Sequence, residues 1–107
     1  MSNCIAEPVE AVDTLKAWVL KDDDKIVGAA WTDEDEGEVF FHVRVTDGKA
    51  LGKAKVLKEI IPFDSWILIP YKLIKAARYL QRYVGLVTYE PIYHKGALYL
   101  PLRRERD

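Results

Sequence analysis

"LKAWVLKDDDKIVGAAWTDEDEGEVFFHVRV", residues 15–45, is the stretch that decides the fold class of this 107-residue chain. Residues 15–20, 26–32 and 38–45 are short runs rich in aliphatic and aromatic side chains, and acidic turn-like segments separate them at 21–25 and 33–37. Short runs of this kind joined by turns are typical of an antiparallel meander. The stretch therefore predicts three strands, with both acidic clusters at the hairpin tips.

The segments around this meander are less distinct. Residues 3–13 have weak helical character, and residues 49–61 fit a helix or a strand, of which we favour a fourth strand. Residues 62–66 predict a bend, followed by a short helical turn at 66–69. Residues 86–89 and 97–100 predict a terminal hairpin or two short extended segments, with Pro91 and Pro101 at edge positions. The predicted fold class is α+β: a small antiparallel sheet of about four strands packed against helices. It forms a single domain over 1–107, with frayed ends at 1–6 and 103–107.

Residues 70–85, "PYKLIKAARYLQRYVG", predict a basic helix. Pro70 suits its first turn, and Gly85 suits the position just beyond its end. An apolar stripe at helical spacing should pack on the sheet; it consists of Leu73, Ala77, Leu80 and Val84. Another face carries Lys72, Lys75, Tyr79 and Arg82, with Tyr71 and Arg78 beside it. This face either binds a ligand or is solvated surface, in which Arg82 complements the helix dipole.

Charge is distributed unevenly along the chain, although the net charge is only -1. Residues 1–40 hold eleven Asp and Glu and three Lys, whereas residues 41–104 hold twelve Lys and Arg and four Asp and Glu. The two halves could fold so that opposite charges interleave as surface pairs. Alternatively, the basic residues form one face that attracts a polyanion.

Catalytic, metal-binding and membrane motifs are not evident in the sequence. His42, His94 and Cys4 lack zinc-ligand spacing, and His42, on a strand beside aromatic residues, is expected to pack rather than to act as a base. We expect no metal, no cofactor and no enzyme activity. The longest apolar run is too short to span a bilayer, no leader opens the chain, and a single cysteine fits a reducing compartment, so we expect a cytoplasmic protein.

Residues 60–80, "IIPFDSWILIPYKLIKAARYL", follow the meander and precede the hairpin-like tail. This arrangement, over roughly residues 10–102, resembles the ThermoDBP and ThermoDBP-related single-stranded DNA-binding proteins of hyperthermophilic archaea. The resemblance implies a four-stranded sheet packed with helices, and a cleft with aromatic walls and a basic rim. Larger members carry a C-terminal leucine zipper; this chain has no heptad tail, so any homo-oligomer would form without one. The Lys, Glu, Ile and Val usage is also thermophile-like.

The function hypothesis is binding of single-stranded DNA or RNA without sequence preference, through base stacking and phosphate neutralisation. The alternatives are a protein–protein adaptor that uses the same Tyr and Arg residues as anchors, and a small enzyme with an unrecognised site. The residues expected to bind nucleic acid are Lys53, Lys55, Phe63, Trp66, Tyr71, Lys72, Lys75, Arg78, Tyr79, Arg82 and Tyr93.

Overall fold

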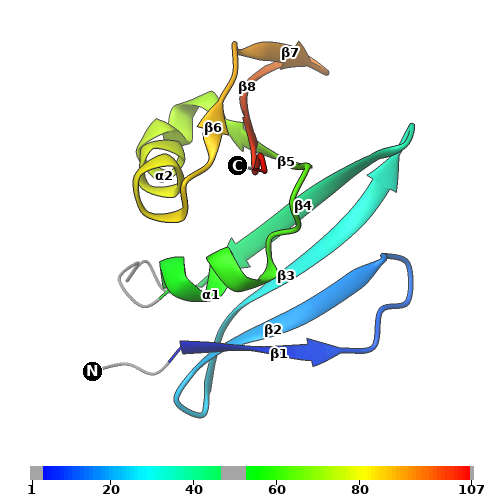
Figure 1. Cartoon of the computed structure of the whole chain (residues 1–107), viewed down its shortest axis with the longest axis vertical. Helices are drawn as coiled ribbons and strands as arrows, with labels where there is room; N and C mark the ends of the chain where they lie inside the picture. The colour runs from blue at the N-terminus through cyan, green and yellow to red at the C-terminus, as the bar shows by residue number, and fades with distance from the viewer. Residues whose placement is uncertain (1–3, 47–52, 107) are drawn as a thin grey trace.

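The computed structural model describes residues 4–46 and 53–106 (Figure 1). The predicted meander is confirmed, and it gains a strand at its outer edge. The four strands pair antiparallel in chain order: β1 (Cys4–Val9), β2 (Lys16–Asp22), β3 (Lys25–Asp35) and β4 (Glu38–Val45). The weak helix predicted at 3–13 is wrong, because residues 4–9 pair with β2 along their whole length.

The sequence predicted a turn at the second acidic cluster, residues 33–37, but most of this cluster lies in a strand. Asp33, Glu34 and Asp35 belong to β3, which pairs with β4 as far as Asp35 opposite Glu38. Only Glu36 and Gly37 make the turn, and both have positive φ angles, 51° and 81°. A two-residue hairpin turn requires this backbone geometry, which glycine adopts without strain. Carboxylates therefore lie along a strand, where the sheet fixes their direction.

The second half of the chain continues the same sheet. It contributes β5 (Ser65–Pro70), β6 (Val87–Thr88), β7 (Ile92–His94) and β8 (Ala97–Arg103). β5 lies parallel to β4 and antiparallel to β8, and β8 also pairs with β6 and β7. Within the described residues, the result is one mixed sheet of eight strands in the order β1-β2-β3-β4-β5-β8-β6, with β7 beside β8. The prediction of a sheet of about four strands packed against helices is therefore wrong.

Two further predictions fail in this half. Residues 66–69 are in β5 and not in a helical turn, because they pair antiparallel with β8. Pro101 lies inside β8 and not at an edge. Its carbonyl accepts a hydrogen bond from the Tyr89 amide, so its ring nitrogen also faces the β6 side, away from the ladder with β5. The missing N–H therefore costs no hydrogen bond to β5.

The helices cover one face of the sheet. α1 (Lys53–Ile60) replaces the predicted fourth strand, and it buries Val56 and Leu57 while Lys55 and Glu59 are exposed. The predicted basic helix is a continuous helical segment made of a 3₁₀ turn, η1 (Tyr71–Leu73), the helix α2 (Ile74–Tyr79), and a π-helical turn, η2 (Leu80–Val84). Gly85 ends it in the left-handed conformation at φ 87°, as predicted. No helix in the described ranges has the length and apolarity needed to cross a membrane.

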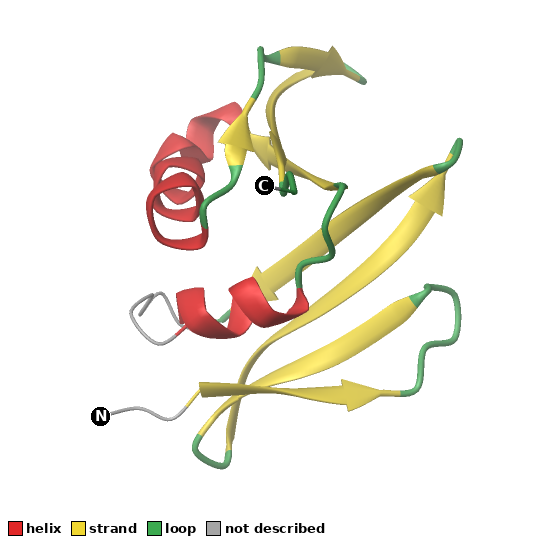
Figure 2. Ribbon diagram, in the orientation of Figure 1, coloured by secondary structure: helices red, strands yellow, loops and turns green. Residues whose placement is uncertain are grey.

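The core lies between this face and the helices (Figure 2). Phe41 from β4, Ile67 from β5 and Leu102 from β8 pack with α1 and with the helical segment 74–84. Neighbouring residues of a strand point to opposite faces. Phe40, His42, Trp66 and Leu68 therefore project from the other face of the sheet, which carries no helix in the described chain.

Candidate functional site

The site begins where two parallel strands separate. β4 and β5 pair only through Val39 with Ser65 and Phe40 with Trp66, at the start of each strand. Beyond these residues, no backbone hydrogen bond joins the two strands in the described chain. β4 stays paired with β3 and β5 stays paired with β8, so the sheet opens as a wedge between them (Figure 1). Main-chain donors and acceptors of both strands face this opening.

A pocket of about 910 Å³ fills the wedge on the helix side. We call it the helix-side pocket. All five residues 41–45 of β4 and all four residues 67–70 of β5 line it, together with side chains from α1 and from the helical segment 71–84. Because successive side chains of a strand point to opposite faces, a pocket lined by consecutive residues of two strands lies between those strands.

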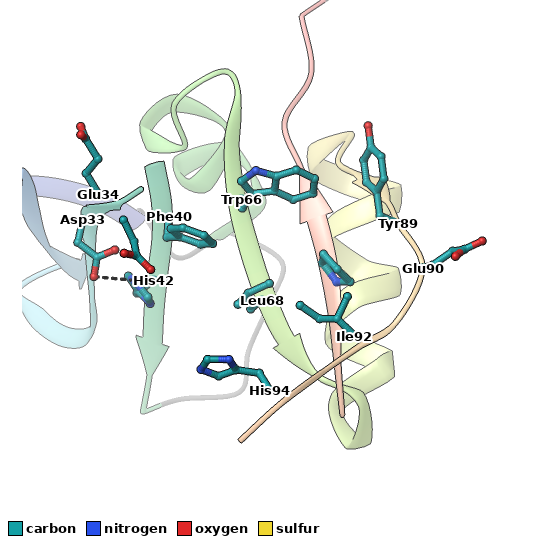
Figure 3. Close-up of a pocket in the computed structure, with 12 residues that line it drawn as sticks. Asp33, Glu34, Phe40, His42, Trp66, Leu68, Tyr89, Glu90, Ile92 and His94 are labelled. Carbon is teal, nitrogen blue, oxygen red and sulfur yellow. Dashed lines mark hydrogen bonds and ion pairs between the residues drawn. The ribbon is translucent and has the colours of Figure 1, made fainter. Parts of the chain in front are cut away.

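A second pocket of about 1060 Å³ opens on the face without helices. We call it the acidic pocket, because its rim holds Asp33, Glu34, Asp35 and Glu90. Its walls are apolar and aromatic; they include Phe40, Trp66, Leu68, Tyr89, Ile92 and Pro101. In Figure 3, Leu68 lies between His42 on one side and Ile92 on the other.

The two pockets meet at His42 and Leu68, which line both of them. The charges of the two openings are opposite. The helix-side pocket is lined by Arg44 and Lys75 and by no acidic residue of the described chain, whereas the acidic pocket is lined by carboxylates and by no Lys or Arg. Two ligands of opposite charge could therefore approach from opposite faces and touch where the strands part.

His42 is held in a defined position at this junction. Its Nε2 lies 3.1 Å from Oδ2 of Asp33 (Figure 3). Its ring stacks on Trp31 with centroids 5.2 Å apart and planes 14° apart. A carboxylate only accepts hydrogen bonds, so Nε2 carries the hydrogen in the neutral ring and Nδ1 keeps its lone pair. The side chains of His42 and Asp33 are 39% and 44% exposed, so solutes can reach the pair.

Trp66 is part of a polar cluster at the far end of the acidic pocket. Its indole nitrogen donates to Glu38, and the guanidinium of Arg103 lies 4.6 Å from its ring centroid. Arg103 also pairs with Glu38 at 3.5 Å, and the Tyr89 ring meets Trp66 edge-on. These contacts fix the indole as a wall of the pocket rather than as a free platform on which a base could stack.

The residues predicted to bind nucleic acid do not line one common pocket. Lys75 and Tyr79 line the helix-side pocket, and Trp66 lines the acidic pocket on the other face. The remaining described residues of that prediction are exposed and line neither pocket; they are Lys55, Phe63, Tyr71, Lys72, Arg78, Arg82 and Tyr93. Two guanidinium groups, from Arg104 and Arg106, lie over the Phe63 ring. The side chain of Lys53 lies outside the described residues.

Tyr79 packs into the protein instead of presenting its ring to solvent. It is half-buried against the core, and its ring contacts Tyr83 with centroids 5.1 Å apart. Burial raises the pKa of the Tyr79 phenol above its ordinary value near 10, while a hydrogen bond with the Ala54 backbone opposes this shift. The phenol thus links α2 to α1 beside the helix-side pocket.

This raised pKa predicts a stability change at alkaline pH. A group whose pKa is raised by folding stabilises the protein fully below its unfolded pKa, about 10, and that contribution is lost as pH rises through the folded pKa. We expect the unfolding free energy of the wild type to fall more steeply between about pH 8 and about pH 11 than that of Tyr79→Phe. Urea denaturation at both pH values measures this. Tyr93→Phe, at a residue that is 78% exposed, should keep the wild-type slope; equal slopes for all three proteins would contradict the effect.

Sequence reasoning missed the His42–Asp33 pair, although the hairpin contains the signal. With a turn at Glu36 and Gly37, residue 31 faces 42 and residue 33 faces 40. Asp33 and His42 are then diagonal neighbours on one face of the sheet, within reach of each other. The predicted turn at Asp33 is incompatible with this register. The meeting of β4 with β5 had no such local signal.

Comparison with known proteins identifies the fold. No family model and no curated protein matches this chain. Among solved structures, the chain is similar to a GnaT-family acetyltransferase from Bordetella pertussis, with a TM-score of 0.62 and 17% sequence identity. The match covers 83% of this chain and 65% of the acetyltransferase chain, so this chain spans just under two thirds of its neighbour's length. At this identity the similarity establishes the fold.

These findings overturn the functional predictions made from the sequence. The resemblance to ThermoDBP proteins is wrong, because the sheet has the arrangement of an acetyltransferase and no match supports a nucleic-acid-binding family. The hypotheses of single-stranded nucleic-acid binding and of a protein adaptor are contradicted by this neighbour. The expectation of a protein without enzyme activity is contradicted too, since the chain shares its fold with an acetyltransferase. Basic and aromatic residues on one helix do not by themselves identify a ligand.

Proposed function

We propose that this chain is an acyltransferase that moves an acyl group, acetyl in the simplest case, from a thioester to an amine. The observation that carries the proposal is the pair of oppositely charged pockets that meet at His42 and Leu68 between diverging parallel strands. Transfer between two substrates requires that both reach one point from different directions. The GnaT-family acetyltransferase with the same fold supports this reading.

The helix-side pocket suits a donor such as acetyl coenzyme A. The donor's extended arm carries amide groups, which can pair with the free main-chain groups of β4 and β5 in the way that an added strand does. Apolar side chains such as Leu57 and Ile67 would contact the arm, and Lys75 on α2 is placed to meet phosphate groups. The thioester supplies the activated carbonyl.

The acidic pocket suits an acceptor that carries an ammonium group. Its carboxylates attract a cation, and its aromatic and aliphatic walls can hold the rest of the molecule. Leu68 stands where the acceptor nitrogen would approach the acyl carbonyl. The chain's own residues thus position both reactants and keep bulk water from one side of the reacting atoms.

Binding of acetyl coenzyme A, measured by isothermal titration calorimetry, tests this proposal. Lys75→Glu removes an attraction for phosphate and adds a repulsion of similar size, which should weaken binding by about five- to tenfold at low salt. Arg78→Glu is the matched control: Arg78 is on the same helix, is exposed, and lies outside the pocket. Its effect should be less than about twofold, since a more distant charge is largely screened.

We expect Lys75→Glu to weaken donor binding more than Arg78→Glu does. If Lys75→Glu and Arg78→Glu weakened binding equally, the donor would be responding to the general charge of the helix and not to the helix-side pocket. If the wild type bound neither acetyl coenzyme A nor coenzyme A, the proposed function would be wrong.

A further inference from the structure

Of the side chains at the junction, His42 is the one equipped to move a proton. It lines both pockets, and Leu68, which shares that position, is aliphatic. An amine that attacks a carbonyl must lose a proton, and imidazole is the side chain most often used to accept it near neutral pH. The position of His42 between the donor side and the acceptor side is therefore where a proton acceptor is required.

We propose that His42 is the catalytic proton acceptor of the transfer and that Asp33 is its positioning residue. This inference rests on the proposed acyltransferase function. Asp33 accepts from Nε2, 3.1 Å away, so the neutral ring keeps its proton on Nε2 and offers the Nδ1 lone pair. The stacked Trp31 ring limits rotation of the imidazole, because a tilted ring would lose the contact at 5.2 Å.

The step balances without any further reagent. The acceptor enters the acidic pocket as an ammonium ion and loses one proton to solvent or to a rim carboxylate. The amine nitrogen then attacks the thioester carbonyl carbon: the C–N bond forms, the C–S bond breaks, and the thiolate leaves with the bonding electron pair. Nδ1 of His42 takes the proton that the nitrogen sheds, and this proton then passes to the thiolate. The Asp33 carboxylate stabilises the imidazolium that exists in between.

The pairing register of β3 with β4 brings Asp33 and His42 together. Asp33 and His42 are diagonal neighbours across the β3–β4 ladder, and both project to the face without helices. The hairpin's short turn fixes the register, because a slip of one residue would send His42 into the core and Phe41 out of it. Burial of Phe41, which is 1% exposed, thus also holds His42 at the junction.

Turnover and donor binding together test the role of His42. Acetyl coenzyme A is the donor, and spermidine, phenethylamine and hydroxylamine are the nucleophiles tried as acceptors, with the acetylated product measured by mass spectrometry. His42→Gln should lower the turnover number by about 100-fold or more, while the dissociation constant for the donor changes less than about twofold. Added imidazole should restore part of the activity of His42→Gly.

Asp33 is tested by a signature that a merely structural role would not change. His42 and His94 are the two histidines of the chain, so their ring nitrogens can be assigned by long-range proton–nitrogen NMR correlation. At mildly alkaline pH, His42 should show a single tautomer with hydrogen on Nε2; Asp33→Asn should mix the tautomers and lower turnover by about tenfold. Glu36→Gln removes a charge from the same hairpin outside both pockets and should change neither.

The outcomes separate this inference from the proposed function. Full turnover in His42→Gln or hydrogen on Nδ1 in the wild type would each overturn His42 as the proton acceptor. Donor binding without transfer to any of the three nucleophiles would overturn the proposed transfer to an amine. Absence of donor binding would instead overturn the proposed function itself.

Discussion

Phe41→Ala is expected to lower the free energy of unfolding by about 3–5 kcal/mol, the usual cost of removing a large aromatic side chain from a core. Phe41 is 1% exposed; it packs with residues of both helices, and its ring lies 6.2 Å from that of Trp18 between centroids. The loss is a large part of the roughly 5–15 kcal/mol that stabilises an ordinary domain. Urea denaturation followed by circular dichroism measures it.

The neighbouring residue provides the control. Phe40→Ala removes the same atoms one position earlier on β4, from the half-buried ring that lines the acidic pocket. Because this ring already contacts solvent, its loss should cost no more than about half as much. A larger loss at Phe40 than at Phe41 would mean that the faces of β4 are assigned the wrong way round.

The meander was predictable because its signal is local. Residues 38–45 nearly alternate between apolar and polar side chains, and β4 has the predicted bounds. The helix beyond Pro70 was predictable for the same reason, since its apolar stripe repeats at helical spacing and Gly85 follows it. The apolar side chains of residues 53–60 fit both the period of a helix and that of a strand. Contacts of Val56 and Leu57 with the core favour the helix.

The site was not predictable in the same way, because it depends on a pairing between distant segments. β5 meets β4 across the intervening helix α1, and no residue of either strand encodes its partner. The positions where this pairing stops determine the wedge and both pockets. The sequence predicted a basic face over residues 72–82 because its residues recur at helical spacing, yet Lys75 lines a pocket whereas Arg78 does not.

The second large effect is expected at Leu68. This half-buried side chain lines both pockets, so a larger one would fill the point where they meet. Leu68→Trp should weaken binding of acetyl coenzyme A by about 10- to 100-fold, since overfilling a packed site costs about 1–3 kcal/mol. Ile26→Trp is the control; it adds the same indole at a residue that is 62% exposed and outside both pockets. Its donor binding should equal that of the wild type.

The central claim is that the acyl group of the donor lies between β4 and β5 at the junction of the two pockets. Comparing amide NMR spectra of the wild-type protein with saturating acetyl coenzyme A and with saturating coenzyme A isolates the effect of the acyl group. We expect the differences to concentrate at His42 and at residues 67–69, and to disappear in Leu68→Trp. Differences confined to residues outside the wedge, or their persistence in Leu68→Trp, would contradict it.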